Sequence, residues 1–361
     1  MSHLLQYRAR RMAAFSRWYG LLFLAALASL AVYILTLAPS VAGFDSAELV
    51  TGAYTLGIVH PTGYPLYLIL GKLITYLPIG SVALRVNLMS ALFAAGSVLL
   101  LGMLIERWTR NALIASLASL FLAFSPSFWS MATVAEVYTL HIFMLTLTIL
   151  LLDHWSDKQQ QRYFFAAVLI FGLSMTNHVS SIFMAVVFVI YLINLNDWKK
   201  NIRLIPGALL VLIAGLSPYL YLPLRYAANP PLNYVQSYYE IDLTTLRGMW
   251  WMVSGEAYRF FSFGYDFPAY MREVLEAFRL LIRNMTWVGM LLGLLGFFRM
   301  KTDVPRHAWA LFAFFGLNLI FFAGYAVADK DTMFLPLYLV WACWVGFGII
   351  QAQNLVQKLP E

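Results

Sequence analysis

The sequence predicts an all-α membrane protein: one membrane-embedded domain over residues 1–361, a bundle of about ten transmembrane helices with juxtamembrane helices in the first outer loop. Hydrophobic residues make up 61% of the chain and charged residues 11%, against roughly 25% charged residues in an ordinary soluble domain. The mean hydropathy is +0.74. A water-soluble core cannot absorb this apolar excess.

The apolar residues fall into separate runs along the chain. A helix that crosses a hydrocarbon layer of ~30 Å needs roughly 20 apolar residues, and fewer when protein surrounds it. Ten runs meet this requirement, at residues 18–38, 84–105, 112–124, 137–153, 163–176, 179–195, 204–222, 281–299, 308–327 and 332–351. The apolar segment 65–77 is shorter and bounded by prolines, so we expect an interfacial helix there.

The basic residues indicate the orientation. Four arginines precede the first run without a clean cleavage site, so this run is predicted to be retained as a first span with a cytoplasmic N-terminus. With ten spans, 15 of the 24 lysines and arginines lie on the inner side, which leaves 9 outside. If 65–77 also crossed, two basic clusters would face outward: Lys199, Lys200 and Arg203, and Arg299, Lys301 and Arg306.

Net charge and cysteine usage exclude other classes of protein. The net charge is +7, but the bases are scattered through short loops and form no continuous stripe, so no nucleic-acid partner is expected. Cys343 is the one cysteine of the chain. A disulfide framework and a cysteine metal site are therefore excluded.

Two long outer segments, 39–83 and 223–280, are expected to form a roof over a site. The first begins with Asp45 and Glu48, which share one face if this segment is helical. The alternative is that Asp45 or Ser46 caps a short helix and Glu48 completes a capping box. Capping is compatible with catalysis, because a cap also holds the carboxylate in place.

Residues 57–66 are rich in glycine and proline, which stiffen or sharply turn the backbone. A rigid turn would present His60 and Tyr64. The alternative is an ordinary loop with a solvated His60.

Further polar residues lie at predicted span ends. Glu136 and Tyr138 stand at an outer helix start, where a carboxylate also favours the helix dipole. Asn177 and His178 lie between two spans, where such residues are often satisfied polar groups of a helix junction. The sequence leaves both explanations open.

Basic residues complete the set on the outer face. Arg225, followed by Asn229, ends the span at 204–222, and a guanidinium can bind a lipid phosphate or act as an interfacial anchor. Arg259 lies in the second outer segment beside tryptophans that resemble an interfacial belt. One side of the membrane thus gathers polar residues that suggest a site: Asp45, Glu48, His60, Glu136, His178 and Arg225.

Five ordered motifs resemble glycosyltransferase family 117, the multispanning proteins formerly grouped as a domain of unknown function. Over about 190 residues the matching segments are Asp45-Ser46-Ala47-Glu48-Leu49, His60-Pro61-Thr62-Gly63-Tyr64-Pro65-Leu66, Ala135-Glu136-Val137-Tyr138, Thr176-Asn177-His178, and Leu222-Pro223-Leu224-Arg225 with Asn229 to Asn233. Thr62 departs from the family, which usually has a second proline there, and loosens the turn slightly.

The resemblance implies a GT-C type fold and similarity to protein O-mannosyltransferases. Such an enzyme moves a sugar, mannose among the candidates, from a polyprenyl- or dolichyl-phosphate donor to a hydroxyl of a protein or glycan, with inversion. It implies Asp45 as the catalytic base, with Glu48 beside it. It further implies that the substrates are bound by His60, Tyr64, Glu136, Tyr138, Asn177, His178, Arg225, Asn229 and Arg259.

Several points stay open at the level of sequence. A divalent metal held by Asp45 and Glu136 is neither required nor excluded. The site would face the periplasm in a bacterial inner membrane, or the lumen of the endoplasmic reticulum in a eukaryote. The alternative function is a transporter or flippase of lipid-linked sugars, which predicts broken helices and polar residues near the midplane.

Overall fold

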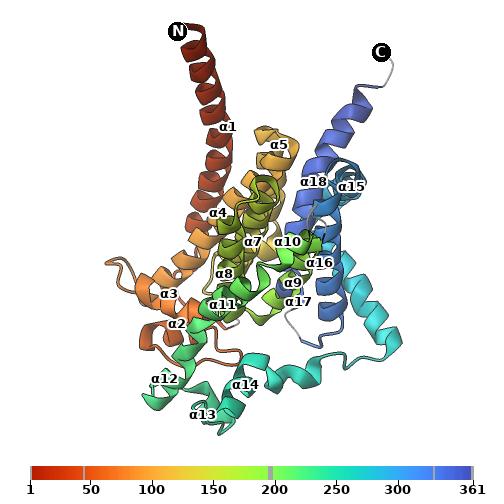
Figure 1. The fold of residues 1–361 in the computed structure, drawn as a ribbon. Helices are drawn as coiled ribbons and strands as arrows, with labels where there is room; N and C mark the ends of the chain where they lie inside the picture. The colour runs from red at the N-terminus through yellow and green to blue at the C-terminus, as the bar shows by residue number, and fades with distance from the viewer. Residues whose placement is uncertain (1, 44, 194–197, 328–329, 359–361) are drawn as a thin grey trace.

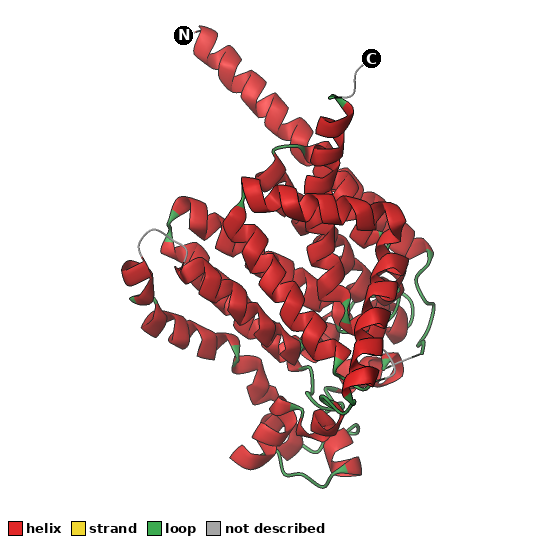
Figure 2. Cartoon of the chain, turned by 90° about the vertical axis from the view of Figure 1, so that its right-hand side faces the viewer, coloured by secondary structure: helices red, strands yellow, loops and turns green. Residues whose placement is uncertain are grey.

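A computed structural model describes residues 2–43, 45–193, 198–327 and 330–358, and of residues 2–18 the backbone alone. These residues are almost entirely helical and contain no strand, apart from two isolated β-bridges, Ile58 with Asn233 and Ser262 with Tyr325. Most of the helices pack side by side in one bundle (Figure 2). Their order is α1 (Ser2–Leu35), α2 (Ser46–Thr55), α3 (Pro65–Ile74), α4 (Val82–Thr109), α5 (Ala112–Ala123), α6 (Pro126–Ala132), α7 (Tyr138–Lys158), α8 (Gln161–Asn177), η1 (Val179–Met184), α9 (Ala185–Ile193), α10 (Trp198–Ile202), α11 (Ile205–Gly215), η2 (Ser217–Leu220), α12 (Tyr221–Ala227), α13 (Tyr234–Tyr238), α14 (Leu246–Ser254), η3 (Glu256–Phe261), α15 (Phe267–Asp303), α16 (Pro305–Ala323), α17 (Lys330–Met333) and α18 (Leu335–Val356).

Each predicted apolar run is helical over most of its length, so the all-α membrane fold is confirmed. The last two residues of the run at 179–195 lie outside the described residues, as do the side chains of the N-terminal arginines. Six described helical segments are long and apolar enough to cross a membrane, or seven if the bent pair α5–α6 is one span. The total of about ten spans stays a prediction, because the remaining runs form shorter helices.

The core of the bundle is built around α18, which is buried without interruption from Leu335 to Gly348. Helix α15 packs along it in the most extensive helix contact of the described chain. At Gly296 a Cβ would lie 1.7 Å from the carbonyl oxygen of Trp344, and at Gly348 one would lie 1.9 Å from that of Leu292. The two backbones therefore touch, a close approach that small residues permit in membrane bundles.

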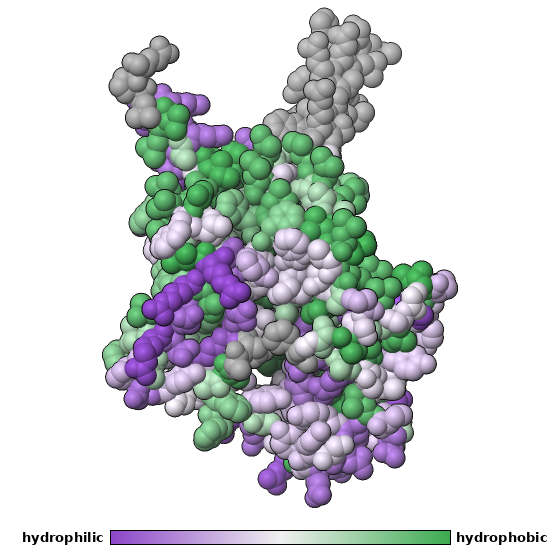
Figure 3. All heavy atoms as spheres, turned by 180° about the vertical axis from the view of Figure 1, so that it is seen from behind, coloured by the Kyte–Doolittle hydropathy of each residue, from purple (hydrophilic) through white to green (hydrophobic). Residues whose placement is uncertain are grey.

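The two ends of the bundle differ. Helix α1 begins and α18 ends at the same end, and α2 and α12–α14 lie at the opposite end (Figure 1). Termini on one side are what an even number of spans requires. Apolar side chains cover much of the upper part of the face in Figure 3, and polar ones gather toward the lower end.

The two segments expected to roof the site are joined to each other. The backbone N–H of Ile58 donates to the carbonyl of Leu232 at 2.8 Å, and that of Tyr234 donates to Ile58 at 2.8 Å. Helix α3 begins at Pro65, whose fixed φ suits a first helical position. Its ten residues form the short helix predicted for this segment.

Candidate functional site

Asp45 stands at the N-terminus of α2, but its carboxylate does not cap the helix. The N-cap position forms no side-chain cap hydrogen bond. The backbone N–H of Asp45 donates instead to Oε1 of Glu136 at 3.2 Å, so Glu48 does not close a capping box. The Asp45 side chain is 52% exposed. The polypeptide thus fixes the backbone of Asp45 while its carboxylate stays accessible.

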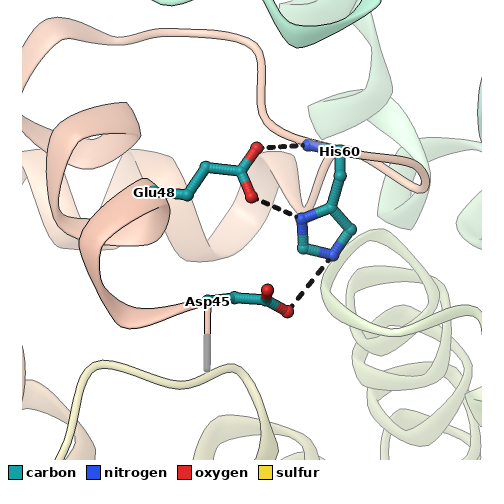
Figure 4. Close-up of side chains that lie close together, drawn as sticks. All are labelled: Asp45, Glu48 and His60. Carbon is teal, nitrogen blue, oxygen red and sulfur yellow. Dashed lines mark hydrogen bonds and ion pairs between the residues drawn. The ribbon is translucent and has the colours of Figure 1, made fainter. Parts of the chain in front are cut away.

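Glu48 holds His60 at two points. Its Oε1 accepts the backbone N–H of His60 at 2.8 Å, and its Oε2 lies 2.7 Å from Nδ1 of the ring (Figure 4). A carboxylate at this distance favours the proton on Nδ1. The His60 side chain is 11% exposed, so the loop holds it firmly and does not leave it in solvent.

The other ring nitrogen of His60 faces Tyr64 and Asp45. Nε2 lies 2.9 Å from the Tyr64 hydroxyl. The same nitrogen lies 3.5 Å from Oδ2 of Asp45 (Figure 4). Burial, with smaller contributions from neighbouring tyrosines and carboxylates, raises the pKa of Tyr64 well above its usual range. Its hydroxyl therefore keeps its proton. The backbone turns here, as the prolines and glycines predicted: the N–H of Gly63 donates to the carbonyl of His60 at 2.8 Å, and Gly63 and Tyr64 both adopt positive φ.

Glu136 lies behind this group and is 2% exposed. It precedes α7, and its backbone exchanges hydrogen bonds with the hydroxyl of Ser90 on α4 at 3.4 Å. Because its carboxylate accepts the N–H of Asp45, it joins the start of α2 to the body of the bundle. Glu136 is not among the residues that line the cavity described next.

A cavity of about 900 Å³ opens beside Asp45. One part is polar, with Asp45, Glu48 and His60. Another part is apolar, with residues of η1 and of the end of α16. The lining includes Asp45, Glu48, His60, Tyr138, His178, Ile182, Phe183, Tyr258, Arg259, Phe321 and Phe322.

Of the predicted residues Tyr138, Asn177 and His178, two reach the cavity and one does not. Tyr138 and His178 line it, with their rings 5.6 Å apart. Asn177 is fully buried and donates to the carbonyl of Val137 at 3.1 Å, and its Oδ1 has no hydrogen-bond partner in the described chain. Burial, with a smaller contribution from His60, lowers the pKa of His178 to about 4.

Arg225 lies apart from the cavity. It lies on α12, and it donates from Nε to the carbonyl of Leu56 at 2.7 Å and from Nη2 to that of Thr55 at 3.4 Å. It therefore supplies hydrogen-bond donors to carbonyls at the C-terminal end of α2, and it is absent from the lining of the cavity beside Asp45. Asn229 lines a separate shallow depression with Pro230 and Pro231. The sequence alone does not show whether an arginine at the end of a span binds backbone carbonyls or a phosphate.

Arg259 is the predicted basic residue that does line the cavity. It is exposed, at the end of η3, and the described residues provide it with no ion pair. The structure adds Tyr234 and Tyr258, whose rings approach His60 edge-on at 6.0 and 6.4 Å. Neither tyrosine was predicted as a site residue, because a tyrosine in an outer loop cannot be told from an interfacial aromatic.

Three ligand atoms, from Asp45, Glu48 and His60, lie within 4.8 Å of one another. Two carboxylates and an imidazole suit a divalent cation. Such an ion would compete with the Glu48–His60 hydrogen bond. Glu136, expected beside Asp45 in such a site, is not part of this group.

Comparison with known proteins gives sequence relatives for part of the chain, and this part holds most of the predicted site residues. Residues 45–202 match the family model of the protein O-mannosyl-transferase TMEM260 N-terminal domain. The chain is 33% identical to protein O-mannosyl-transferase TMEM260 of Mus musculus over 240 residues, 64% of this chain and 33% of that protein. It is 28% identical to the Dictyostelium discoideum protein of this name over 236 residues, 60% and 28% of the two chains.

Solved structures of ArnT from Cupriavidus metallidurans resemble the whole fold. The form bound to undecaprenyl phosphate superposes with a TM-score of 0.67 over 93% of this chain and 60% of ArnT, at 14% identity. The apo form gives 0.63 over 96% and 61%, at 12% identity. The GT-C type fold and the resemblance drawn from the motifs are confirmed. The matched region spans about a third of the length of the curated relatives.

Proposed function

From its relation to the GT-C type membrane glycosyltransferases, we propose that this chain transfers a sugar from a polyprenyl- or dolichyl-phosphate donor to an acceptor hydroxyl. Mannose and the hydroxyls of protein serine or threonine are the first sugar and acceptor to test, because the relatives are named protein O-mannosyl-transferases. The site would face the non-cytoplasmic side, as the distribution of basic residues favours.

Asp45 is the base in this reaction. Its carboxylate takes the proton of the acceptor hydroxyl as the hydroxyl oxygen bonds to the anomeric carbon. The bond from that carbon to the phosphate oxygen breaks at the same time, so the lipid phosphate leaves with the electron pair and the configuration inverts. The exposed carboxylate beside a large cavity is the observation that carries this assignment.

The neighbours of Asp45 prepare it for this role. Glu136 is held by the backbone N–H of Asp45, and Glu48 by the backbone N–H and the ring of His60. Neither carboxylate therefore competes for the position of Asp45. The Tyr64 hydroxyl, which stays protonated, can donate to Nε2 of His60 while the ring proton of His60 stays on Nδ1, beside Glu48.

The two-part lining of the cavity suits a lipid-linked sugar. The sugar would lie at the polar part, near Asp45, and the prenyl chain would leave along the apolar part formed by η1 and α16. An anion at a membrane boundary needs a partner. Arg259 is the exposed cation of this lining, so we assign the phosphate to it in place of Arg225.

A transporter of lipid-linked sugars is supported less well. Helices α5 and α6 meet at a bend of 76°, and α15 departs from helical geometry at Thr286, as broken helices would. The polar lining, however, comes from the outer segments and the α8–η1 junction, and a transporter needs a polar path toward the other side.

The test is an assay of the purified protein with a panel of polyprenyl-phosphate sugars and a serine/threonine peptide, read by mass spectrometry. We expect one donor to be consumed, and Asp45→Asn to lower turnover about 10²–10⁴-fold without changing thermal unfolding. Asp242→Asn is the matched control, since Asp242 is an exposed outer acid whose Oδ1 contacts to Thr244 an asparagine can keep. Wild-type turnover by the Asp45 variant would refute the assignment.

A further inference from the structure

A chain of hydrogen bonds runs from the cavity into the bundle through two histidines and three serines. Nδ1 of His178 lies 2.7 Å from Oγ of Ser180, which also lies 3.4 Å from Nε2 of His141. Nδ1 of His141 lies 3.2 Å from Oγ of Ser181, and that oxygen lies 2.6 Å from Oγ of Ser174. His141 is 2% exposed, and its ring lies 4.7 Å from that of His178.

The direction of these hydrogen bonds follows from counting protons. Each hydroxyl has one proton to donate, and each neutral imidazole has one N–H and one acceptor nitrogen. Among the described residues, the Ser174 hydroxyl has Ser181 as its one hydrogen-bond partner, and Ser174 is 1% exposed. If Ser181 donated to Ser174, the proton of Ser174 would have no acceptor in a buried place, which is costly.

Ser174 therefore donates to Ser181, and the rest of the chain follows. Ser181 donates to Nδ1 of His141, which places the proton of His141 on Nε2. That N–H donates to Ser180, and Ser180 donates to Nδ1 of His178. His178 is left with its proton on Nε2, a nitrogen with no hydrogen-bond partner in the described part of the chain, on a ring that lines the cavity.

We propose that Ser174, Ser181, His141 and Ser180 are positioning residues that fix His178 as a neutral N–H donor to a phosphate oxygen of the lipid-linked substrate. The identity of this ligand rests on the proposed function. His178 stands where a phosphate would lie, since it directly precedes η1, which supplies Ile182 and Phe183 to the apolar part of the cavity. The sugar and the prenyl chain would extend to either side.

The low pKa of His178, about 4, agrees with this arrangement. The imidazole stays neutral at neutral pH, so the donor depends on the tautomer that its neighbours select. A neutral donor also adds to the charge supplied by Arg259 without repelling that cation. The serines and His141 matter because they settle which nitrogen carries the proton.

The first experiment reads the tautomer directly. Nitrogen NMR of protein labelled with ¹⁵N-histidine, with His178 assigned by its loss in His178→Gln, should show a protonated Nε2 and an unprotonated Nδ1 near pH 7. Ser181→Ala should give a mixture of tautomers. The control Ser29→Ala also removes a buried hydroxyl, one bonded within its own helix, and should change nothing. A proton on Nδ1 in the wild type would overturn the proposal.

The second experiment measures binding of polyprenyl phosphate and of the matching polyprenol, which lacks the phosphate. His178→Leu should weaken binding of the phosphate about tenfold and leave the alcohol unchanged. His178→Gln, whose side-chain N–H can stand near the position of Nε2, should restore most of the affinity. Equal weakening of both lipids would contradict a phosphate contact.

Both readouts are independent of turnover. Asp45→Asn should bind polyprenyl phosphate like the wild type, so a failed base assignment leaves the His178 result intact. Conversely, an inactive Asp45 variant together with a His178→Leu variant that binds normally would reject the donor role of His178 and retain the transferase.

Discussion

Both ends of the bundle hold a histidine in contact with a carboxylate, but the two groups differ in what they leave exposed. At the end that carries the termini, Asp153 accepts hydrogen bonds from Trp108 Nε1 and His307 Nε2, both at 2.8 Å, and from Arg107. At the other end, His60 lies between Glu48 and Asp45. Asp153 is 2% exposed, and the Asp45 side chain 52%.

Charge balance separates the two groups further. Asp153 and Asp157 share Arg107, with His307 beside them, so the inner acids are matched by nearby bases. Asp45 and Glu48 flank one histidine next to a cavity, and Glu136 lies behind them on the backbone N–H of Asp45. The inner group is closed and compensated, as a structural tie between α4, α7 and α16 should be. The outer group keeps an excess of carboxylate where a substrate can reach it.

Removing the buried acid is the largest change that the comparison predicts. Asp153→Ala leaves Arg107 and His307 without their buried partner, so we expect a loss of about 3–5 kcal/mol in the free energy of unfolding. Denaturant unfolding in detergent would measure it. Sugar transfer per folded molecule should not change. A variant as stable as the wild type would mean that the inner group is not a structural tie.

Asp157→Ala is the control for this effect. Asp157 also pairs with Arg107 but its side chain is 54% exposed, and exposed ion pairs contribute about 0–1 kcal/mol.

The outer group should respond in the opposite way. Glu48→Gln keeps an oxygen for the backbone N–H of His60 but removes the charge that holds Nδ1. We expect turnover to fall about 10–100-fold, the value of one charge-assisted hydrogen bond, with little change in unfolding. The comparison between the two ends would break if Glu48→Gln unfolded the protein or left turnover unaltered.

The sequence was sufficient for much of the fold because lipid imposes a simple rule: backbone polar groups must be satisfied within the segment, so apolar runs become helices. Every predicted run is helical, and α3 is the short helix its prolines indicated. The span count was less accessible. Segments such as Val179–Ile193 form helices shorter than a full crossing, and hydropathy does not report where a helix ends.

For the site, local motifs were more informative than composition. Asp45, Glu48, His60 and Tyr64 come from one stretch of chain, and the structure brings them together. His141 was missed because a histidine inside an apolar run gives no sign of its hydrogen-bond partners, which come from η1. The partners of Arg225 could not be predicted, because the carbonyl that its Nε binds lies 169 residues away in the chain, at the end of α2.

Arg225 gives the smallest expected effect, and it tests where the phosphate binds. Because its guanidinium donates to the carbonyls of Leu56 and Thr55, Arg225→Met should lower the free energy of unfolding by about 1–2 kcal/mol through loss of these bonds at the end of α2. Affinity for polyprenyl phosphate should change less than twofold, whereas Arg259→Met should weaken it about tenfold. The reverse order, in which Arg225→Met binds the lipid more weakly than Arg259→Met, would assign the phosphate to Arg225 on α12. The cavity beside Asp45 would then have to extend to that helix when a lipid binds.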